Sequence, residues 1–119
     1  MRPIRSFEIA IDVVDAAPVA AFWTELCGYR TDDALTSRWV HLQPPEGLPV
    51  LNLQRVPEAK TGKNRLHFDL YYDDPEVWID RAIALGATKV REHHEDDDWF
   101  TVMLDPSGNE FCICQERQP

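Results

Sequence analysis

The sequence predicts an α+β fold built from two βαβββ modules in a pseudo-twofold repeat. Residues 7–18, FEIAIDVVDAAP, align with residues 66–76, LHFDLYYDDPE, at an offset of 59. Residues 38–54 align with residues 98–114 at an offset of 60, with tryptophan second in both segments. Each half also carries helix-start and helix-stop signals between these segments. Recurrence of strand, helix, turn and strand signals in one order favours a repeat over chance matches.

The first module starts with an alternating strand, whose apolar residues Phe7, Ile9, Ile11 and Val13 we expect to face a helix. Asp15 is placed to cap that helix, Pro18 lies in its first turn and Gly28 ends it. The predicted buried stripe of the helix comprises Val19, Phe22, Trp23 and Leu26. We expect a short strand near residues 29–35 and then strand, turn and strand within residues 38–54.

The second module repeats this order. Its first strand alternates Leu66, Phe68 and Leu70 with His67, Asp69 and Tyr71. Asp74 is placed to cap the next helix, Pro75 occupies its first position and Gly86 ends it. Its predicted buried residues are Trp78, Ile79, Ala82, Ile83 and Leu85. A strand is expected near residues 88–93, and DPSG at residues 105–108 predicts a type I turn between the last two strands.

The length of 119 residues fits one domain over residues 1–119. We divide it into module one at 1–56, a linker at 57–64 and module two at 65–119. A half of this size has little core of its own, so we expect the halves to fold as one unit. The linker carries Lys60 and Lys63 and is either a solvated connector or a positive lip for an anionic ligand.

The charge of the chain excludes some classes of binding partner. A net charge of -9 argues against nucleic acid and anionic membranes. No apolar run approaches the ~18 residues of a membrane span. The alternating N-terminal residues predict a strand and not a signal peptide. Three cysteines, an odd number, disfavour a disulfide framework and suit a reducing cytoplasm.

Four of the predicted strands carry a polar second face opposite their apolar one. Its residues are Glu8, Ala10, Asp12, Asn52, Gln54, His67, Asp69, Tyr71, Glu110, Cys112 and Cys114. A semi-enclosed ligand pocket needs such a mixture of carboxylate, amide, imidazole and thiol groups. A solvated face of an antiparallel sheet is polar as well, so both interpretations stay open.

Several motifs together resemble a known family. AAFWTELCGY at residues 20–29, RLHFDL at 65–70, LGAT at 85–88 and DPSGNEF at 105–111 look like the glyoxalase/bleomycin-resistance/dioxygenase superfamily, the vicinal oxygen chelate proteins, and most like its compact bacterial glyoxalase-like domains. The resemblance covers essentially the whole chain. It implies a cup-shaped mixed sheet with helices outside, a small-molecule ligand between the modules and, as in many such proteins, a homodimer.

The resemblance also implies a metal site. In metal-dependent members of the family, four positions supply the metal ligands. The resemblance places them on Glu8, Asn52 (or Gln54), His67 and Cys112 of this sequence, and it implies that Glu8 is the carboxylate that moves a proton. Glu8 and His67 are good ligands, amide oxygens are weak ones, and Cys112 replaces the usual carboxylate. Two alternatives follow: one divalent ion (zinc, nickel, manganese or iron), or no metal, which the incomplete set favours. His67 alone also fits a polar-face histidine bonded to Glu8 or Asp69.

Two functions therefore remain in view. The first is a metal-dependent lyase or isomerase, and the second is a metal-free protein that sequesters a small molecule, as bleomycin-resistance relatives do. A ring-cleaving dioxygenase is disfavoured because its two-histidine-one-carboxylate site is incomplete. Expected ligand-binding residues are Asp12, Trp39, Gln54, Asp69, Tyr71, Trp99, Met103 and Cys114. For the tryptophans, packing at strand starts is the alternative, and His93 and His94 fit a solvated hairpin.

Overall fold

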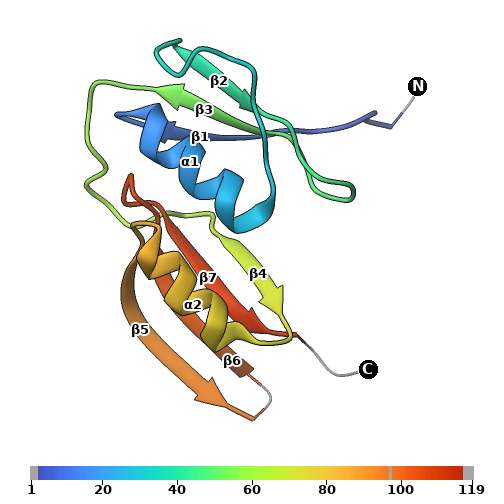
Figure 1. Ribbon diagram of the computed structural model, residues 1–119, viewed down its shortest axis with the longest axis vertical. Helices are drawn as coiled ribbons and strands as arrows, with labels where there is room; N and C mark the ends of the chain where they lie inside the picture. The colour runs from blue at the N-terminus through green and yellow to red at the C-terminus, as the bar shows by residue number, and fades with distance from the viewer. Residues whose placement is uncertain (1–2, 97, 117–119) are drawn as a thin grey trace. The chain divides into compact units, whose positions relative to one another are not determined.

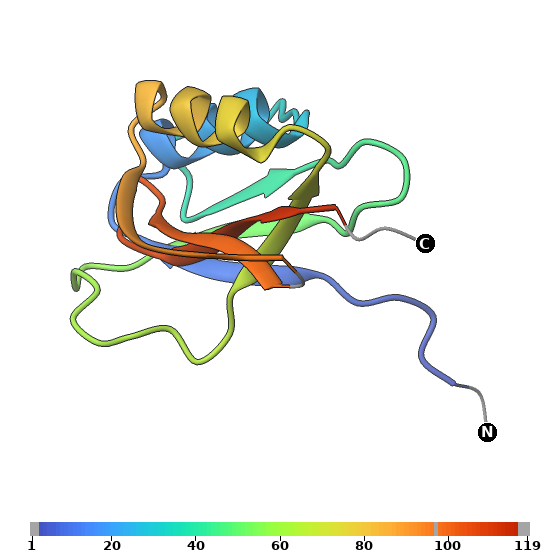
Figure 2. The same cartoon turned by 90° about the horizontal axis from the view of Figure 1, so that it is seen from below.

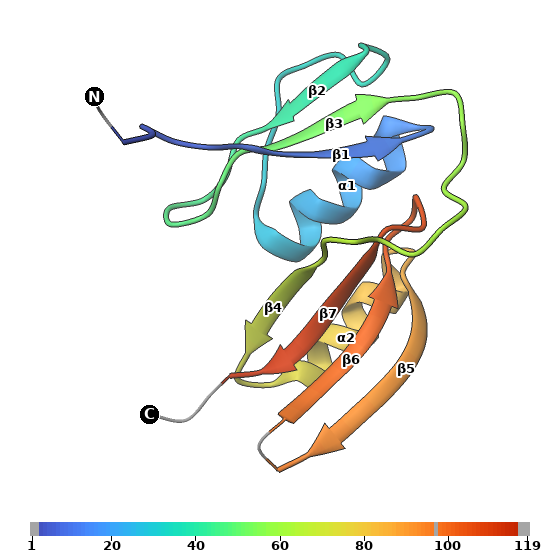
Figure 3. The same ribbon diagram turned by 180° about the vertical axis from the view of Figure 1, so that it is seen from behind.

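The computed structural model describes residues 3–96 and 98–116. The chain divides into two compact units, Met1–Ala59 and Lys60–Pro119. In each unit one helix lies over one face of a small mixed sheet (Figures 1 and 2). Seen from behind, the other face of each sheet is not covered by the helix of its own unit (Figure 3). The predicted α+β class with two modules is confirmed.

The first unit holds β1 (Ile9–Val13), α1 (Ala16–Cys27), β2 (Trp39–Leu42) and β3 (Leu51–Arg55). The sheet order is β1-β3-β2, with β1 parallel and β2 antiparallel to β3. All four residues of the predicted α1 stripe are buried. The Asp15 side chain accepts a hydrogen bond from the Ala17 N–H, and Gly28 takes a left-handed φ of 81° at the C-cap, so both predicted helix ends are confirmed.

The strand expected near residues 29–35 does not form. Only an isolated bridge joins Arg30 to Gln43 there. Beyond it, the Thr31 hydroxyl accepts from the Asp33 N–H, and the Asp33 carboxylate accepts from the His41 N–H. Such side-chain bonds to backbone groups replace a strand ladder, because they satisfy the same donors.

The second unit holds β4 (Phe68–Tyr72), α2 (Pro75–Ala84), β5 (Thr88–Glu95), β6 (Asp98–Leu104) and β7 (Glu110–Gln115). The sheet order is β4-β7-β6-β5, and α2 packs against β4 and β7. This unit therefore has the complete βαβββ order. The predicted turn is confirmed as well, since the Gly108 N–H donates to the Asp105 carbonyl and the Asp105 carboxylate accepts from two further backbone N–H groups.

Three predictions about the apolar residues are wrong. Phe7 and Leu66 precede β1 and β4 and are 69% and 85% exposed, because the ladders start only at Ile9 and Phe68. In α2, Ile79 and Ala82 are buried as predicted, but Ile83 is 44% exposed. Trp78 and Leu85 are half-buried. The helix therefore presents a narrower apolar stripe than the sequence suggested.

The repeat persists at the level of strand register. Ala10 pairs with Asn52 across β1 and β3, and Asp69 pairs with Cys112 across β4 and β7. These are equivalent positions at the offsets of 59 and 60. The first and last strands of each module are thus parallel neighbours in the same register.

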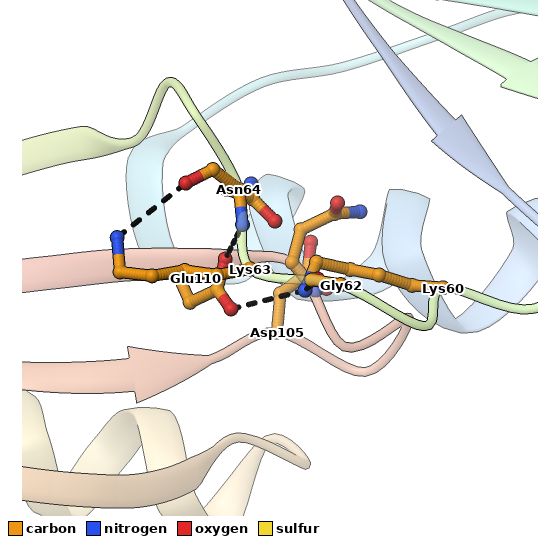
Figure 4. Close-up of polar contacts among 7 residues, drawn as sticks. Lys60, Gly62, Lys63, Asn64, Asp105 and Glu110 are labelled. Carbon is orange, nitrogen blue, oxygen red and sulfur yellow. Dashed lines mark hydrogen bonds and ion pairs between the residues drawn. The ribbon is translucent and has the colours of Figure 1, made fainter.

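The segment before β4 is attached to the first residue of β7, Glu110 (Figure 4). Lys60 Nζ lies 3.0 Å from Glu110 Oε1, and the Asn64 N–H donates to Glu110 Oε2 at 2.6 Å. Lys60 also donates to the Gly62 carbonyl. Of the two linker lysines, Lys60 is thus paired with a carboxylate, and Lys63 Nζ donates to the Asn64 carbonyl at 3.4 Å.

Candidate functional site

The second unit contains a cavity of about 240 Å³ on the sheet face opposite α2. Strand alternation creates this face, because Asp69, Tyr71, Cys112 and Cys114 point away from the buried Phe111 and Ile113. The residues that line the cavity are His67, Asp69, Tyr71, Asp98, Trp99, Phe100, Cys112, Cys114 and Gln115. Six of these were predicted as metal or ligand residues from the sequence.

His67, Asp69 and Cys112 form a cluster at this cavity. One imidazole nitrogen, one carboxylate oxygen and the thiol sulfur all lie within 4.8 Å of one another. His67 Nε2 is 3.2 Å from Asp69 Oδ1. His67 and Asp69 are exposed, whereas Cys112 is buried beneath them. The sequence reasoning expected His67 and Cys112 as ligands, and Asp69 joins them because it pairs with Cys112 across the sheet.

The Cys112 thiol is protonated in neutral solution. Its pKa is raised to about 11, first by burial and then by the neighbouring Asp69 carboxylate, which repels the thiolate charge and accepts a hydrogen bond from the thiol. Arg91 and Lys63 act in the opposite direction but do not compensate. A thiol in this state is a poor nucleophile, so the His67, Asp69 and Cys112 cluster is not an activated cysteine triad.

The cluster fits a metal ion by its chemistry. Imidazole, carboxylate and thiolate are the ligand types of zinc, whose tetrahedral bonds of about 2.0–2.3 Å place ligand atoms about 3.5 Å apart. The His67 and Asp69 atoms already have such a separation. Side-chain rotation would have to bring the sulfur closer, and the ion would have to displace the thiol proton.

Aromatic rings form a second part of the cavity wall. The Trp99 ring stacks on His94 with centroids 3.7 Å apart, and the Phe100 ring stacks on His93 with centroids 4.9 Å apart. His94 Nε2 also lies 2.9 Å from the Thr101 hydroxyl. The two histidines thus hold the rings through stacking contacts on the β5–β6 hairpin.

Side chains of the first unit form a hydrogen-bonded network. Asn52 Nδ2 donates to Glu8 Oε1 at 2.7 Å, and His41 Nδ1 lies 2.5 Å from Asn52 Oδ1. The amide oxygen of Asn52, the predicted metal-ligating atom, therefore already accepts one hydrogen bond, from His41. His41 was missed from the sequence, although it shares strand parity with Trp39, which was predicted.

The remaining predicted residues are distributed over both units. In the first unit Asp12 pairs with Gln54, and Gln54 pairs with Trp39, so these three lie in one row across the sheet. In the second unit Met103 is fully buried and pairs with Phe111. The structure therefore places Met103 on the core face, whereas Cys112 and Cys114 lie on the cavity face. The prediction of Met103 as a ligand-binding residue is therefore wrong, because its pairing with the buried Phe111 puts it on the core face of β6.

A model of the glyoxalase-like domain family matches residues 8–114. The chain belongs to this family. The match includes every residue of the cluster and of the Glu8 network, and it confirms the superfamily resemblance. No curated protein matches this glyoxalase-like chain. No helix in residues 3–96 and 98–116 is long and apolar enough to cross a membrane.

Solved structures share the fold at low sequence identity. A glyoxalase/bleomycin resistance protein/dioxygenase family enzyme from Burkholderia phytofirmans is 19% identical, with a TM-score of 0.72 and coverage of 91% of this chain and 95% of that one. Lactoylglutathione lyase from Agrobacterium tumefaciens is 20% identical, with a TM-score of 0.65 and coverage of 96% of both. A mutant of the fosfomycin resistance protein FosX from Listeria monocytogenes, solved with Mn(II) and 1S,2S-dihydroxypropylphosphonic acid, is 14% identical, with a TM-score of 0.76 and coverage of 94% and 90%.

Proposed function

We propose that this glyoxalase-like chain binds a small organic molecule in the cavity of its second unit. The observation that carries the proposal is the composition of the cavity wall. Aromatic rings, carboxylates, an imidazole and two buried thiols converge on one concave surface. Binding sites combine apolar walls with a few placed polar groups in this way. The volume of about 240 Å³ suits a ligand with a single ring.

Fluorescence of Trp99 reports on this proposal. Chelator-treated protein is titrated with a panel of monocyclic aromatic compounds, and the same titration is repeated with Trp99→Phe. We expect saturable quenching in the wild type that is lost in the variant, because Trp99 lines the cavity. Trp78→Phe is the matched control, since Trp78 stacks on Tyr72 and does not line that cavity. Flat traces across the panel would count against ligand binding.

A second candidate function is a metal-dependent lyase or isomerase. It is favoured by the three potential ligand atoms of His67, Asp69 and Cys112, which would hold the ion. A bound divalent ion would act as a Lewis acid on a substrate oxygen. The assignment of Glu8 as the carboxylate that moves a proton belongs to this candidate. The Listeria FosX mutant, which shares the fold, was solved with Mn(II).

Metal analysis separates the two candidates. Protein purified without a metal-affinity tag is loaded with zinc, nickel, manganese or iron(II) and then dialysed. The metalloenzyme candidate predicts about one ion per chain, lost in Asp69→Ala and kept in Asp80→Ala, because Asp80 lies on α2 and outside the cluster. Substoichiometric metal under all four conditions would contradict the metalloenzyme candidate, and only the metal-free binding function would remain.

A further inference from the structure

The charge of the cavity wall is one-sided. Its nine residues include two carboxylates, Asp69 and Asp98, but neither lysine nor arginine. Among the residues that the structure describes, histidines are the ion-pair partners of these carboxylates: His67 lies 3.2 Å from Asp69, and His93 lies 3.3 Å from Asp98. An imidazole is positive only when protonated, so neither pair contains the permanent positive charge that a lysine or an arginine would supply.

The charge of the whole chain has the same sign as the charge of the cavity wall. The net charge of -9 attracts positive ligands over longer range.

The aromatic part of the wall also suits a positive group. Tyr71, Trp99 and Phe100 line the cavity, and ring faces attract cations. One cation already uses this chemistry, because the Arg91 guanidinium carbon lies 5.7 Å from the centroid of the Phe100 ring. Carboxylates and ring faces together can hold a molecule that has a charged amine at one end and a flat apolar group at the other.

We infer that the ligand of this cavity is a small organic cation, a protonated amine joined to a single aromatic ring. The inference rests on the proposed function and adds the class of ligand. Asp98 and Asp69 pair with the ammonium group, and the rings of Trp99 and Phe100 contact the flat part. The two carboxylates repel anionic compounds of the same size. In the metal-free protein, the ammonium group replaces His67 as the partner of Asp69.

Three compounds of nearly equal size test the inference. Phenethylamine, phenethyl alcohol and phenylacetate differ mainly in charge, and their affinities for chelator-treated protein are measured by calorimetry. We expect the amine to bind about tenfold tighter than the alcohol, and phenylacetate to bind most weakly. Raising NaCl from about 50 to about 500 mM should lower the affinity for the amine and leave the affinity for the alcohol unchanged.

A matched pair of variants locates the effect. Asp98→Asn should lower the affinity for phenethylamine about threefold or more without changing that for phenethyl alcohol. Asp80→Asn removes the same charge from α2, on the other side of the sheet, and should change neither. If the alcohol or phenylacetate binds as tightly as the amine, the ligand class is wrong while the binding function stands. If none of the three binds, the result contradicts the binding function itself.

Discussion

The protonation state of Cys112 depends on whether the site holds a metal. It lies at the position where the family resemblance implies a metal-ligating carboxylate, and its exposed fraction is 7%. Its closest charged neighbour is a carboxylate and not a base, so burial and Asp69 both keep the thiol protonated. A bound metal would reverse this state, because metal ions bind the thiolate. The same residue thus distinguishes the metal-free form from a metal-bound one.

The raised pKa of Cys112 predicts how stability depends on pH. Its thiol titrates near 9.0 when unfolded and near 11 in the fold, so between these values the unfolded chain loses the proton first. The stabilisation is therefore complete below pH 9.0 and is lost as pH rises through about 11. Urea unfolding with chelator present should show a steeper loss in the wild type than in Cys112→Ala. Parallel curves for the two proteins would contradict the assignment.

Asn52 is the central residue of the first-unit network. Its amide donates to Glu8 and accepts from His41, and the residue is buried. Asn52→Ala removes both of these side-chain hydrogen bonds, so we expect the free energy of unfolding to fall by about 1–3 kcal/mol. Gln43→Ala, directly after β2 and exposed, is the control and should cost little. A wild-type stability for Asn52→Ala would show that water replaces the network.

For β4 and β7, the sheet face of each residue could be predicted from the sequence, whereas the partner of a residue on a neighbouring strand could not. The alternation of β4 and β7 places Asp69 and Cys112 on one face, and the cavity lies there. The contact of His41 with Asn52 depends on how β2 pairs with β3, which a single sequence does not specify. Met103 shows the same limit, since its face follows from its pairing with Phe111.

At the scale of elements, helices were predicted best because their ends carry local signals. Asp15, Gly28 and Pro75 act through neighbouring backbone atoms, so no knowledge of the tertiary structure is required. The strand expected at residues 29–35 failed for the opposite reason. A strand exists only when a partner pairs with it, and Asp33 and Thr31 offer the backbone alternative hydrogen bonds.

The two helix N-termini give a matched pair of predictions. Asp15 accepts a bond from the Ala17 N–H, whereas Asp74 makes no side-chain capping bond in front of α2. Asp15→Ala should lower the free energy of unfolding by about 1 kcal/mol, and Asp74→Ala should lower it by much less. Urea denaturation of both variants measures the difference. Equal losses would mean that helix–charge interactions, and not the capping bond, stabilise these helices.

At the scale of the whole molecule, the repeat was visible in the sequence and is present in the structure. The equivalent pairs Ala10–Asn52 and Asp69–Cys112 occupy the same register in the two units. The units differ in detail, since only the second has all four strands of the predicted module. The boundary between the units falls at residues 59 and 60, where the sequence changes from the first module to a segment that contacts β7.

Glu110 holds the segment before β4 in place, and its pKa gives a prediction about the strength of that attachment. Burial alone would raise the pKa of Glu110, but the Lys60 ammonium and the Asn64 N–H outweigh it and hold the pKa below its usual value. A lowered pKa stabilises the fold above the unfolded pKa, and this stabilisation is lost as pH falls through the folded pKa. Glu110→Gln should therefore cost about 1 kcal/mol at neutral pH and nothing in acid. The exposed Glu58→Gln is the control, and a pH-independent loss would contradict this account.

The central claim is that the second-unit cavity is the ligand site, and nitrogen-15 NMR of the four tryptophan indoles tests it most directly. Phenethylamine, phenethyl alcohol and phenylacetate are titrated separately into labelled protein. The account predicts that the Trp99 indole signal shifts with saturation, most strongly for the amine, while the Trp23 and Trp78 signals stay in place. Trp23 lies on α1 and is buried, and Trp78 lies on α2. A Trp99 signal that stays fixed with all three compounds would contradict the claim.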